Sequence, residues 1–404
     1  KRPPISEARI EKYNGNEEHM RFVSVRSLAI GLLLAVGSLS ACTSTAKDLF
    51  KGVDRIVAVG DLHGDYDQYI KVLTTNGLVD EQLRWQGGKT HFVQLGDVVD
   101  RGPDSIRIIR HLMKLEKEAR KKGGRVHVLI GNHEVMNIQG DLRYVHPGEY
   151  SALITENSDA VRARYIEAVF KHRVSIDPTL ATNPDLVMTG LKKEFPLGYV
   201  EHRTIWGPGQ EMAKWVASHN TVIRINDSLF VHGGMNPHTE YRKLSEINRQ
   251  VRRRISASFD GEDISNSPEG PLWYRGLAKN GADVELAPLL EMLEFYDATR
   301  IFIAHTPTHG AILTRLDGKV IMIDVGISAY YGGSLANIVI EDGILKVMHR
   351  GTLVPFPGDD LPVQEYLEIV SELEPADSRL RRYVQFLDNQ VDREKELMSP
   401  GGVN

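Results

Sequence analysis

The sequence lacks several features that would mark large classes of protein. Its 404 residues include a single cysteine, Cys42, so no disulfide can form within the chain. The net charge of −5 gives no general attraction to nucleic acid or to anionic membranes. We find no glycine-rich nucleotide loop. The remaining composition, 41% hydrophobic and 25% charged, is that of an ordinary globular protein. Its length allows one large α/β domain with insertions, or two domains.

A long apolar run is also missing, but the N-terminal region contains a shorter one. Arg21 and Arg26 precede an uncharged apolar run from Leu28 to Leu39, and small residues follow up to Cys42. A membrane-spanning helix needs about 20 apolar residues, so this run is too short. The order of basic, apolar and small residues is typical of a secretory signal. The alternative is a short buried helix with an incidental cysteine.

The segment "LSAC" that ends at Cys42 resembles a bacterial lipobox, in which the cysteine becomes the lipid-modified first residue of a lipoprotein. This resemblance implies a mature chain in the bacterial cell envelope, anchored through Cys42 and facing the periplasm. Thr43, in place of Asp, favours the outer membrane. Residues 1–19 contain no methionine and precede Met20, so we leave them out of the fold prediction.

The next part of the chain repeats one pattern, in which a β-branched, aliphatic run ends in glycine and a polar cluster follows. The three examples are "DRIVAVG" with "DLHGD", "THFVQLG" with "DVVDRG", and "GRVHVLIG" with "NHE". Helix-like segments at 66–79 and 103–122 separate them. Alternation of strands and helices predicts a parallel βαβαβ core with helices on its faces, an α/β fold.

The pattern changes after residue 134, and this change divides the chain. Residues 137–200 are polar and predict an insertion or cap with a helix over 158–173. Strand-like runs then return, and the last two predict a hairpin that turns at Asp342 and Gly343. We therefore expect a signal and tether over 1–50, a main domain over 51–355, and a helical C-terminal extension over 356–404.

The polar clusters are predicted to meet, because ligands bind at the carboxyl ends of strands in open α/β sheets. Oxygen and imidazole donors without thiolate favour Mn, Fe or Zn in mixed coordination. Six candidate ligands, one of them a carboxylate able to bridge, favour two ions about 3.5–4 Å apart. Asp65 and Glu134 are either supporting or turn residues. The candidates at strand ends are Asp61, His63, Asp97, Asp100, Arg101, Asn132, His133, His232 and His305.

The motifs "GDLHGD", "GDVVDRG", "GNHE", "HGG" and "AHT" occur in the order found in the calcineurin-like metallophosphoesterases, and the sequence resembles their phosphoprotein phosphatase branch. The resemblance covers residues 54 to 350. "EFPLGY", "PLWYRG" and the bacterial signal resemble the Shewanella-like protein phosphatases. The family fold implied is a β-sandwich of mixed sheets flanked by helices, with a dinuclear metal site at strand ends.

The resemblance also implies roles for individual residues. The first metal would be held by Asp61, His63 and Asp97, and the second by Asp97, Asn132, His232 and His305. His133 would protonate the leaving group while Asp100 orients it. Arg101 and Arg275 would grip the phosphate oxygens, a bidentate fit that lysine would not reproduce.

The function implied is that of a metal-dependent phosphomonoesterase, in which a hydroxide bridging two metals attacks phosphorus directly. A cysteine-nucleophile mechanism is excluded, because Cys42 lies in the signal. Phosphotyrosine is the expected substrate of such a protein phosphatase, with phosphoserine and phosphothreonine as further candidates. Two alternatives stay open: a dinucleoside polyphosphate or nucleotide phosphohydrolase, and a non-catalytic surface-binding lipoprotein.

Overall fold

The structure is a computed structural model that describes residues 47–256, 263–358 and 361–398. The predicted signal, Cys42 and most of the predicted tether lie outside these residues. Within the described ranges, no helix combines the length and apolar character needed to cross a membrane.

One of the two sheets contains the three runs that were predicted to form a parallel core. Its strand order is β12-β11-β10-β2-β3-β4. The strands β2, β3 and β4 are parallel, whereas β10, β11 and β12 join them in antiparallel fashion. The strands are β2 (Arg55–Val59), β3 (His91–Gln94), β4 (Arg125–Val128), β10 (Ala336–Glu341), β11 (Ile344–His349) and β12 (Thr352–Pro355).

The hairpin between β10 and β11 is the one predicted from the sequence. Asp342 and Gly343 form its turn, with φ values of 51° and 81°. Two-residue hairpin turns with positive φ at both positions match the twist of the strands, which is why an Asp-Gly pair is favoured there. The parallel core and the hairpin are both confirmed.

The second sheet has the order β1-β5-β6-β7-β9-β8, and buried side chains of both sheets belong to one core. Side chains alternate between the faces of a strand. In β5, Ile223 and Ile225 join the core shared with the first sheet, whereas Val222 joins a second cluster that includes Leu289 and Met292 of α11 (Ala282–Phe295). Two mixed sheets around one core form the predicted sandwich. The strands are β1 (Leu49–Phe50), β5 (Val222–Ile225), β6 (Ser228–Val231), β7 (Arg300–Ile303), β8 (Leu313–Arg315) and β9 (Val320–Met322).

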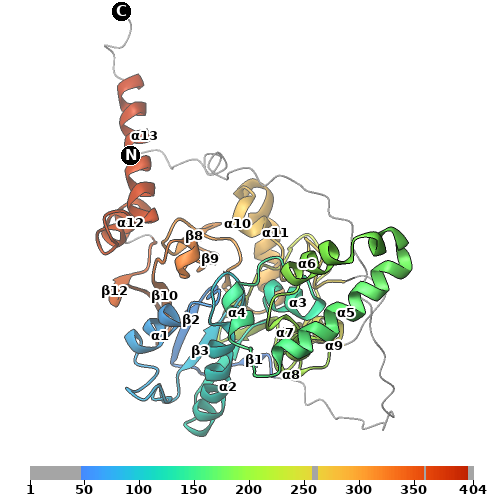
Figure 1. Cartoon of the computed structure of the whole chain (residues 1–404). Coiled ribbons are helices and arrows are strands. Elements are labelled where there is room, and N and C mark those ends of the chain that lie inside the picture. The colour runs from blue at the N-terminus through green and yellow to red at the C-terminus, as the bar shows by residue number, and fades with distance from the viewer. Residues whose placement is uncertain (1–46, 257–262, 359–360, 399–404) are drawn as a thin grey trace, which may run out of the picture. The chain divides into compact units, whose positions relative to one another are not determined.

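Helices α1 (Tyr66–Thr75) and α2 (Ser105–Lys121) connect the parallel strands, as predicted (Figure 1). The buried residues of α2 recur every three or four positions, so one face of the helix packs on the sheet. They include Ile108, Leu112, Leu115 and Ala119. Asp65 accepts a hydrogen bond from the backbone N–H of Gln68 and thereby caps α1.

The predicted insertion is more helical than the sequence indicated. The predicted helix is α5 (Ser158–Ile176), but α4 (Pro147–Ser151), η2 (Pro178–Thr182), α6 (Pro184–Glu194) and α7 (Tyr199–Trp206) are also present. Three of these additional elements begin with proline at the first helical position, where proline is tolerated although it reads as a loop signal. A small separate core of Ile166, Leu191 and Phe195 holds α5 and α6 together.

The insertion is tied to the main domain at two helix ends. Arg203 of α7 donates hydrogen bonds to the carbonyls of Asn137 and Ile138, at the end of α3 (Asn132–Gln139). Glu149 of α4 accepts one from the backbone N–H of Ser105, the first residue of α2, at 2.8 Å. Both helices follow strand ends that carry candidate site residues.

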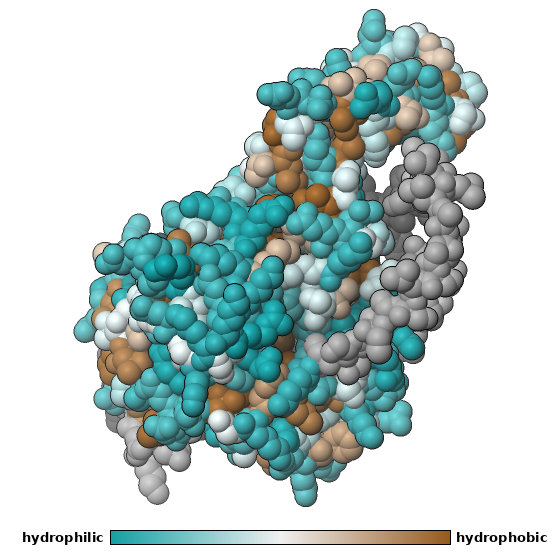
Figure 2. Space-filling view, turned by 90° about the horizontal axis from the view of Figure 1, so that it is seen from below, coloured by the Kyte–Doolittle hydropathy of each residue, from teal (hydrophilic) through white to brown (hydrophobic). Residues whose placement is uncertain are grey.

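The C-terminal region packs on the main core. Tyr366 and Val370 of α12 (Val363–Glu372) and Leu380 of α13 (Arg379–Met398) are fully buried members of that core. After α12, the buried Glu374 lies 2.9 Å from His349 and 2.7 Å from Arg350. On the face drawn in Figure 2, hydrophilic residues predominate and hydrophobic ones gather in small patches.

Candidate metal centre

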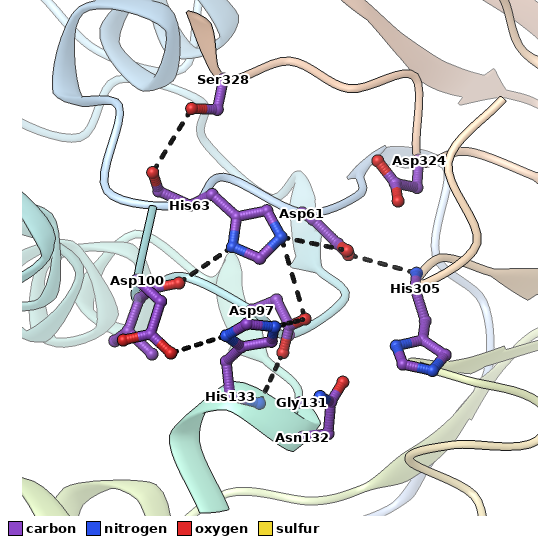
Figure 3. Close-up of polar contacts among 12 residues, drawn as sticks. Asp61, His63, Asp97, Asp100, Gly131, Asn132, His133, His305, Asp324 and Ser328 are labelled. Atoms are coloured by element: carbon purple, nitrogen blue, oxygen red, sulfur yellow. Dashed lines mark hydrogen bonds and ion pairs between the residues drawn. The ribbon is translucent and has the colours of Figure 1, made fainter. Parts of the chain in front are cut away.

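The candidate residues converge where strands of both sheets end, as Figure 3 shows. Asp61 and His63 follow β2, Asp97 follows β3, and His232 and His305 follow β6 and β7 of the other sheet. Each of these side chains is at least 95% buried. Asn132 and His133 form the first turn of α3 after β4. The site therefore joins the ends of the two sheets, which explains why its residues are spread over 245 positions from 61 to 305.

Asp97 occupies the middle of the cluster. Its Oδ2 lies 3.3 Å from Nε2 of His232, 3.8 Å from Nε2 of His133 and 4.0 Å from Nε2 of His63. Burial opposes ionisation of Asp97, but His232 and His133 outweigh it and hold its pKa well below the usual range. A carboxylate between two groups of imidazoles has the position that a bridging ligand requires.

Glu134 fixes the loop that carries Asp97. Its carboxylate accepts hydrogen bonds from the backbone N–H groups of Asp97 at 3.0 Å, Val98 at 2.8 Å and Gly131 at 2.8 Å. Burial, together with the charge of Asp97, raises the pKa of Glu134 to about 7. Of the two residues left open by the sequence, Glu134 therefore supports the centre directly, whereas Asp65 caps α1 and accepts a bond from the N–H of Ala329.

Asp61 and His63 lie on one side of Asp97. Nε2 of His63 is 3.7 Å from Oδ2 of Asp61, while its Nδ1 is engaged by the carbonyl of Val99 at 3.0 Å. Burial and the neighbouring His133 lower the pKa of His63 to about 3, so the ring is neutral near pH 7. A neutral imidazole with one nitrogen held by a carbonyl presents the other nitrogen as a ligand.

Asn132, His232 and His305 lie on the other side. Oδ1 of Asn132 lies 2.9 Å from Nε2 of His232, whose Nδ1 is 2.7 Å from the carbonyl oxygen of Leu95. The backbone N–H of His305 donates to Oδ1 of Asp61 at 3.3 Å, which links the two sides. Nε2 of His305 is buried and has no hydrogen-bond partner.

These residues fit two divalent cations. Ligand atoms of Asp97, His232 and His305 lie within 4.8 Å of one another, and so do those of Asp97, His63 and His133. The second group contains His133 where the sequence predicted Asp61. We still regard Asp61 as the ligand, because Nδ1 of His133 is bound to a carboxylate and its ring favours the protonated form. Nε2 of His305 is buried without a partner, and the carboxylates of Asp61 and Asp97 lie close enough to repel each other. Both features indicate that the site binds cations.

His133 and Asp100 form the shortest contact in the site, with 2.6 Å between Nδ1 and Oδ2. The other oxygen of Asp100 accepts from Nδ2 of Asn137 at 2.9 Å, which fixes the carboxylate. Burial alone would lower the pKa of His133, but Asp97 and Asp100 more than compensate and raise it. An imidazolium oriented by a carboxylate can act as a general acid near neutral pH.

Arg101 is surrounded by aromatic rings. Its guanidinium carbon lies 3.8 Å from the ring centroid of Tyr144, 4.8 Å from that of Tyr330 and 5.9 Å from that of Tyr331. Its Nη1 donates to the Tyr330 hydroxyl at 2.9 Å. The ring of Tyr144 also lies 5.1 Å from that of His133. We call Tyr144, Tyr330 and Tyr331 the tyrosine rim. Cation–π contacts of this kind hold an arginine in place.

Arg275 lies beside His305 at the edge of the centre. Its Nη1 donates to the carbonyl of His305 at 2.8 Å and to Oγ1 of Thr306 at 2.9 Å. Beside it is an open cavity of about 760 Å³. Trp273 lines this cavity, and its ring lies 5.5 Å from that of His305 in an edge-on arrangement. The cavity is lined by Asn236, His238, Trp273, Lys279 and Glu285, among others.

Five of the ten candidate residues have left-handed backbone conformations, with positive φ. Residues other than glycine adopt such conformations with difficulty. We call these five the left-handed site positions. They are His63 at φ 46°, Asp97 at 54°, Asp100 at 70°, Arg101 at 68° and His305 at 62°. The loops after the strands turn sharply at these residues and so aim their side chains at one point.

The structure brings all ten candidate residues to one place, but the sequence analysis missed some of their neighbours. Asp324 is 2% exposed and follows β9 directly beside Asp61 (Figure 3). Its segment "KVIMIDVG" also ends an aliphatic run in a carboxylate, although the glycine follows the carboxylate there instead of preceding it, and that signal could have identified it. The tyrosine rim had no such signal.

Comparison with known proteins agrees with this geometry. Residues 54–309 match the model of the calcineurin-like phosphoesterases. The chain belongs to this family. It is therefore a phosphatase enzyme with a metal-dependent phosphoesterase site.

Two relatives of the chain are protein phosphatases by name. Shewanella-like protein phosphatase 2 of Arabidopsis thaliana is 32% identical over 69% of this chain and 73% of its own length. Shewanella-like protein phosphatase 1 of Plasmodium berghei is 27% identical over 74% of this chain and 75% of its own. A solved structure, the cold-active protein-tyrosine phosphatase of a psychrophilic Shewanella, is 27% identical, with a TM-score of 0.58 over 81% of this chain and 88% of that one. The predicted family, branch and fold are thereby confirmed.

Proposed function

We propose that this phosphoesterase hydrolyses phosphate monoesters of protein side chains, with phosphotyrosine as its preferred substrate. The observation that carries the proposal is the tyrosine rim around Arg101, beside His133. A phosphotyrosyl group combines a dianion with an aromatic ring, so it can use both the guanidinium and the ring faces. The open cavity next to Arg275 adds room for residues that flank the phosphorylated one. The name of the Shewanella structure supports the same choice.

The chain's own residues provide most of the chemistry. We assign one ion to Asp61, His63 and Asp97, and the other to Asp97, Asn132, His232 and His305, with Mn, Fe or Zn as the candidate metals. Divalent ions at such a centre polarise phosphoryl oxygens and lower the pKa of water.

The remaining groups act on the substrate. Arg101 and Arg275 would hold the phosphate oxygens on two sides and orient the phosphorus for in-line displacement. His133 would donate the proton on Nε2 to the departing oxygen, because Asp100 occupies its Nδ1. The arrangement requires no covalent enzyme intermediate.

A metal-reconstituted substrate comparison tests the proposal. The protein is stripped with chelator, restored with Mn²⁺, and assayed on a phosphotyrosine peptide, its phosphoserine counterpart and diadenosine tetraphosphate. We expect the highest kcat/KM for the phosphotyrosine peptide. A higher kcat/KM for the dinucleotide would refute the proposed class of substrate. No turnover with Mn²⁺, Fe²⁺ or Zn²⁺ would refute the proposed phosphatase activity.

A matched pair of variants tests the role of the tyrosine rim. Tyr330→Phe keeps the ring but removes the hydroxyl that accepts from Arg101, whereas Tyr330→Ala removes both. If the rim recognises the substrate ring, Tyr330→Ala should lower kcat/KM for phosphotyrosine more than for phosphoserine, and Tyr330→Phe should affect both substrates alike. An equal loss for both substrates in Tyr330→Ala would argue against ring recognition.

We further propose that the mature protein is lipid-anchored at Cys42 and faces the periplasm, on the basis of the signal-like sequence before it. Labelling with a clickable fatty acid tests the anchor. Label should appear on the wild-type chain and vanish in Cys42→Ser. Equal labelling of the two chains would exclude this anchor.

A further inference from the structure

A buried carboxylate beyond the six assigned ligands lies against the centre. Asp324 is 2% exposed, and its Oδ1 accepts a hydrogen bond from the backbone N–H of Gly326 at 3.1 Å. Its Oδ2 is buried without a hydrogen-bond partner. In Figure 3 the side chain points toward the gap between Asp61 and His305. Burying a carboxylate oxygen without a partner is unfavourable, so its retention here calls for a compensating charge.

The backbone around Asp324 is fixed relative to the ligands. Its carbonyl accepts from the N–H of Thr308 at 2.8 Å, in the loop that carries His305. Gly60, next to Asp61, approaches so closely that a Cβ there would lie 2.9 Å from Cα of Asp324 and 2.7 Å from the carbonyl oxygen of Ile323. These two contacts attach Asp324 to one ligand loop from each sheet.

The charges in this part of the site are unbalanced. Asp61, Asp97 and Asp324 are all at most 3% exposed. Arg275 interacts electrostatically with all three carboxylates, but its Nη1 donates to the carbonyl of His305 rather than to any of them. His133, another cationic group of the site, contacts Asp97 and Asp100. Two of the three acids are assigned as ligands, so the third adds negative charge beside Asp61, where it favours divalent cations.

We propose that Asp324 is a positioning residue for the metal centre, which supports Asp61 and raises its affinity for a divalent cation without being a ligand itself. The inference rests on the proposed metal centre and deepens it. It implies that the set of residues needed for metal retention is larger than the family motifs indicate.

Titration of the metal-free protein with Mn²⁺ by calorimetry tests this role. The variants are Asp324→Asn, which keeps an oxygen for the N–H of Gly326, and the control Asp317→Asn in the exposed turn between β8 and β9. We expect two ions per chain in all three proteins, with affinity at one site reduced about 10–100-fold in Asp324→Asn only, as is usual for residues that support metal ligands. Unchanged affinity in Asp324→Asn would overturn the proposal, and so would the loss of one of the two ions, since that would make Asp324 a ligand.

Activity at different Mn²⁺ concentrations provides a second readout. If Asp324 acts through metal affinity, the lower activity of Asp324→Asn at limiting Mn²⁺ should return to the wild-type level at saturating Mn²⁺. A deficit that persists at saturation would contradict this role. Should Asp324→Asn fail to fold, Asp324→Ser offers a hydroxyl to the same N–H and is judged by the same affinities. A wild-type protein that binds no divalent cation would instead refute the proposed function, so the two failures are distinct.

Discussion

The buried Glu149 should make the stability of this protein fall as the pH rises. Glu149 is 2% exposed and caps the first turn of α2 from the insertion, through the N–H of Ser105. The residue before that helix, Asp104, makes no capping bond of its own. Burial, with smaller contributions from Asp100 and Asp104, raises the pKa of Glu149 to about 7. The capping bond is too weak to restore the ordinary value.

The size of the effect follows from this pKa. A free glutamic acid has a pKa of 4.5 and Glu149 one of about 7 in the folded protein. Each tenfold difference in proton affinity corresponds to about 1.4 kcal/mol, so ionising Glu149 destabilises the fold by about 3 kcal/mol. The stabilising proton is fully bound below about pH 4.5 and is lost as the pH rises through about 7. About 2 kcal/mol of this change falls between pH 5.5 and 8.

Urea unfolding of the metal-free protein across this pH range measures the effect. Glu149→Gln keeps an oxygen for Ser105 but cannot ionise, so its stability relative to wild type should increase by about 2 kcal/mol between pH 5.5 and 8. Glu167→Gln, an exposed substitution on α5, serves as the control and should follow wild type. A difference between Glu149→Gln and wild type that stays constant within about 0.5 kcal/mol over this range would refute the reasoning.

Three further predictions concern the site and the C-terminal region. His133→Asn should lower turnover of alkyl phosphates far more than that of nitrophenyl phosphate, with metal content unchanged; equal losses would remove its role as the acid. Glu134→Ala should lower the free energy of unfolding by at least about 3 kcal/mol in urea, because three buried N–H groups lose their acceptor; a loss below about 1 kcal/mol would contradict this. Glu374→Gln should cost about 2 kcal/mol by weakening the bonds to His349 and Arg350, and wild-type stability would mean that these contacts do not hold the C-terminal region.

The sequence predicted which residues meet at the centre, because each motif is local. Asp61, Asp97 and His133 follow aliphatic runs within a few residues, and the geometry of parallel strands then brings them together. The contacts that hold them in place are not local. Glu134 binds N–H groups 36 and 37 positions earlier in the chain, and Arg101 meets Tyr330 across 229 positions. No short pattern encodes such contacts, so the supporting residues were assigned only partly or not at all.

Secondary structure, too, could be predicted where the signal is local and was missed where it is not. The hairpin at Asp342 and Gly343 could be predicted because one dipeptide determines the turn. The helices of the insertion were largely missed, and three of them begin with proline, at 147, 178 and 184, which local sequence does not distinguish from a loop signal. Their packing depends on a small core that joins Ile166 to Leu191 and Phe195, 25 and 29 positions later in the chain.

The left-handed site positions have a consequence for how this enzyme can evolve. A residue with a side chain loses about 1 kcal/mol in that conformation, a penalty that glycine avoids. Selection for thermal stability alone would therefore favour glycine where the chain now has His63, Asp97 or His305. Each such gain would delete a residue that we propose as a metal ligand, so thermal stability and catalysis place opposite demands on the same few backbone angles. Stabilised descendants of this protein should carry their improvements elsewhere, in the helices of the insertion and on the surface, while the strained loops stay unaltered.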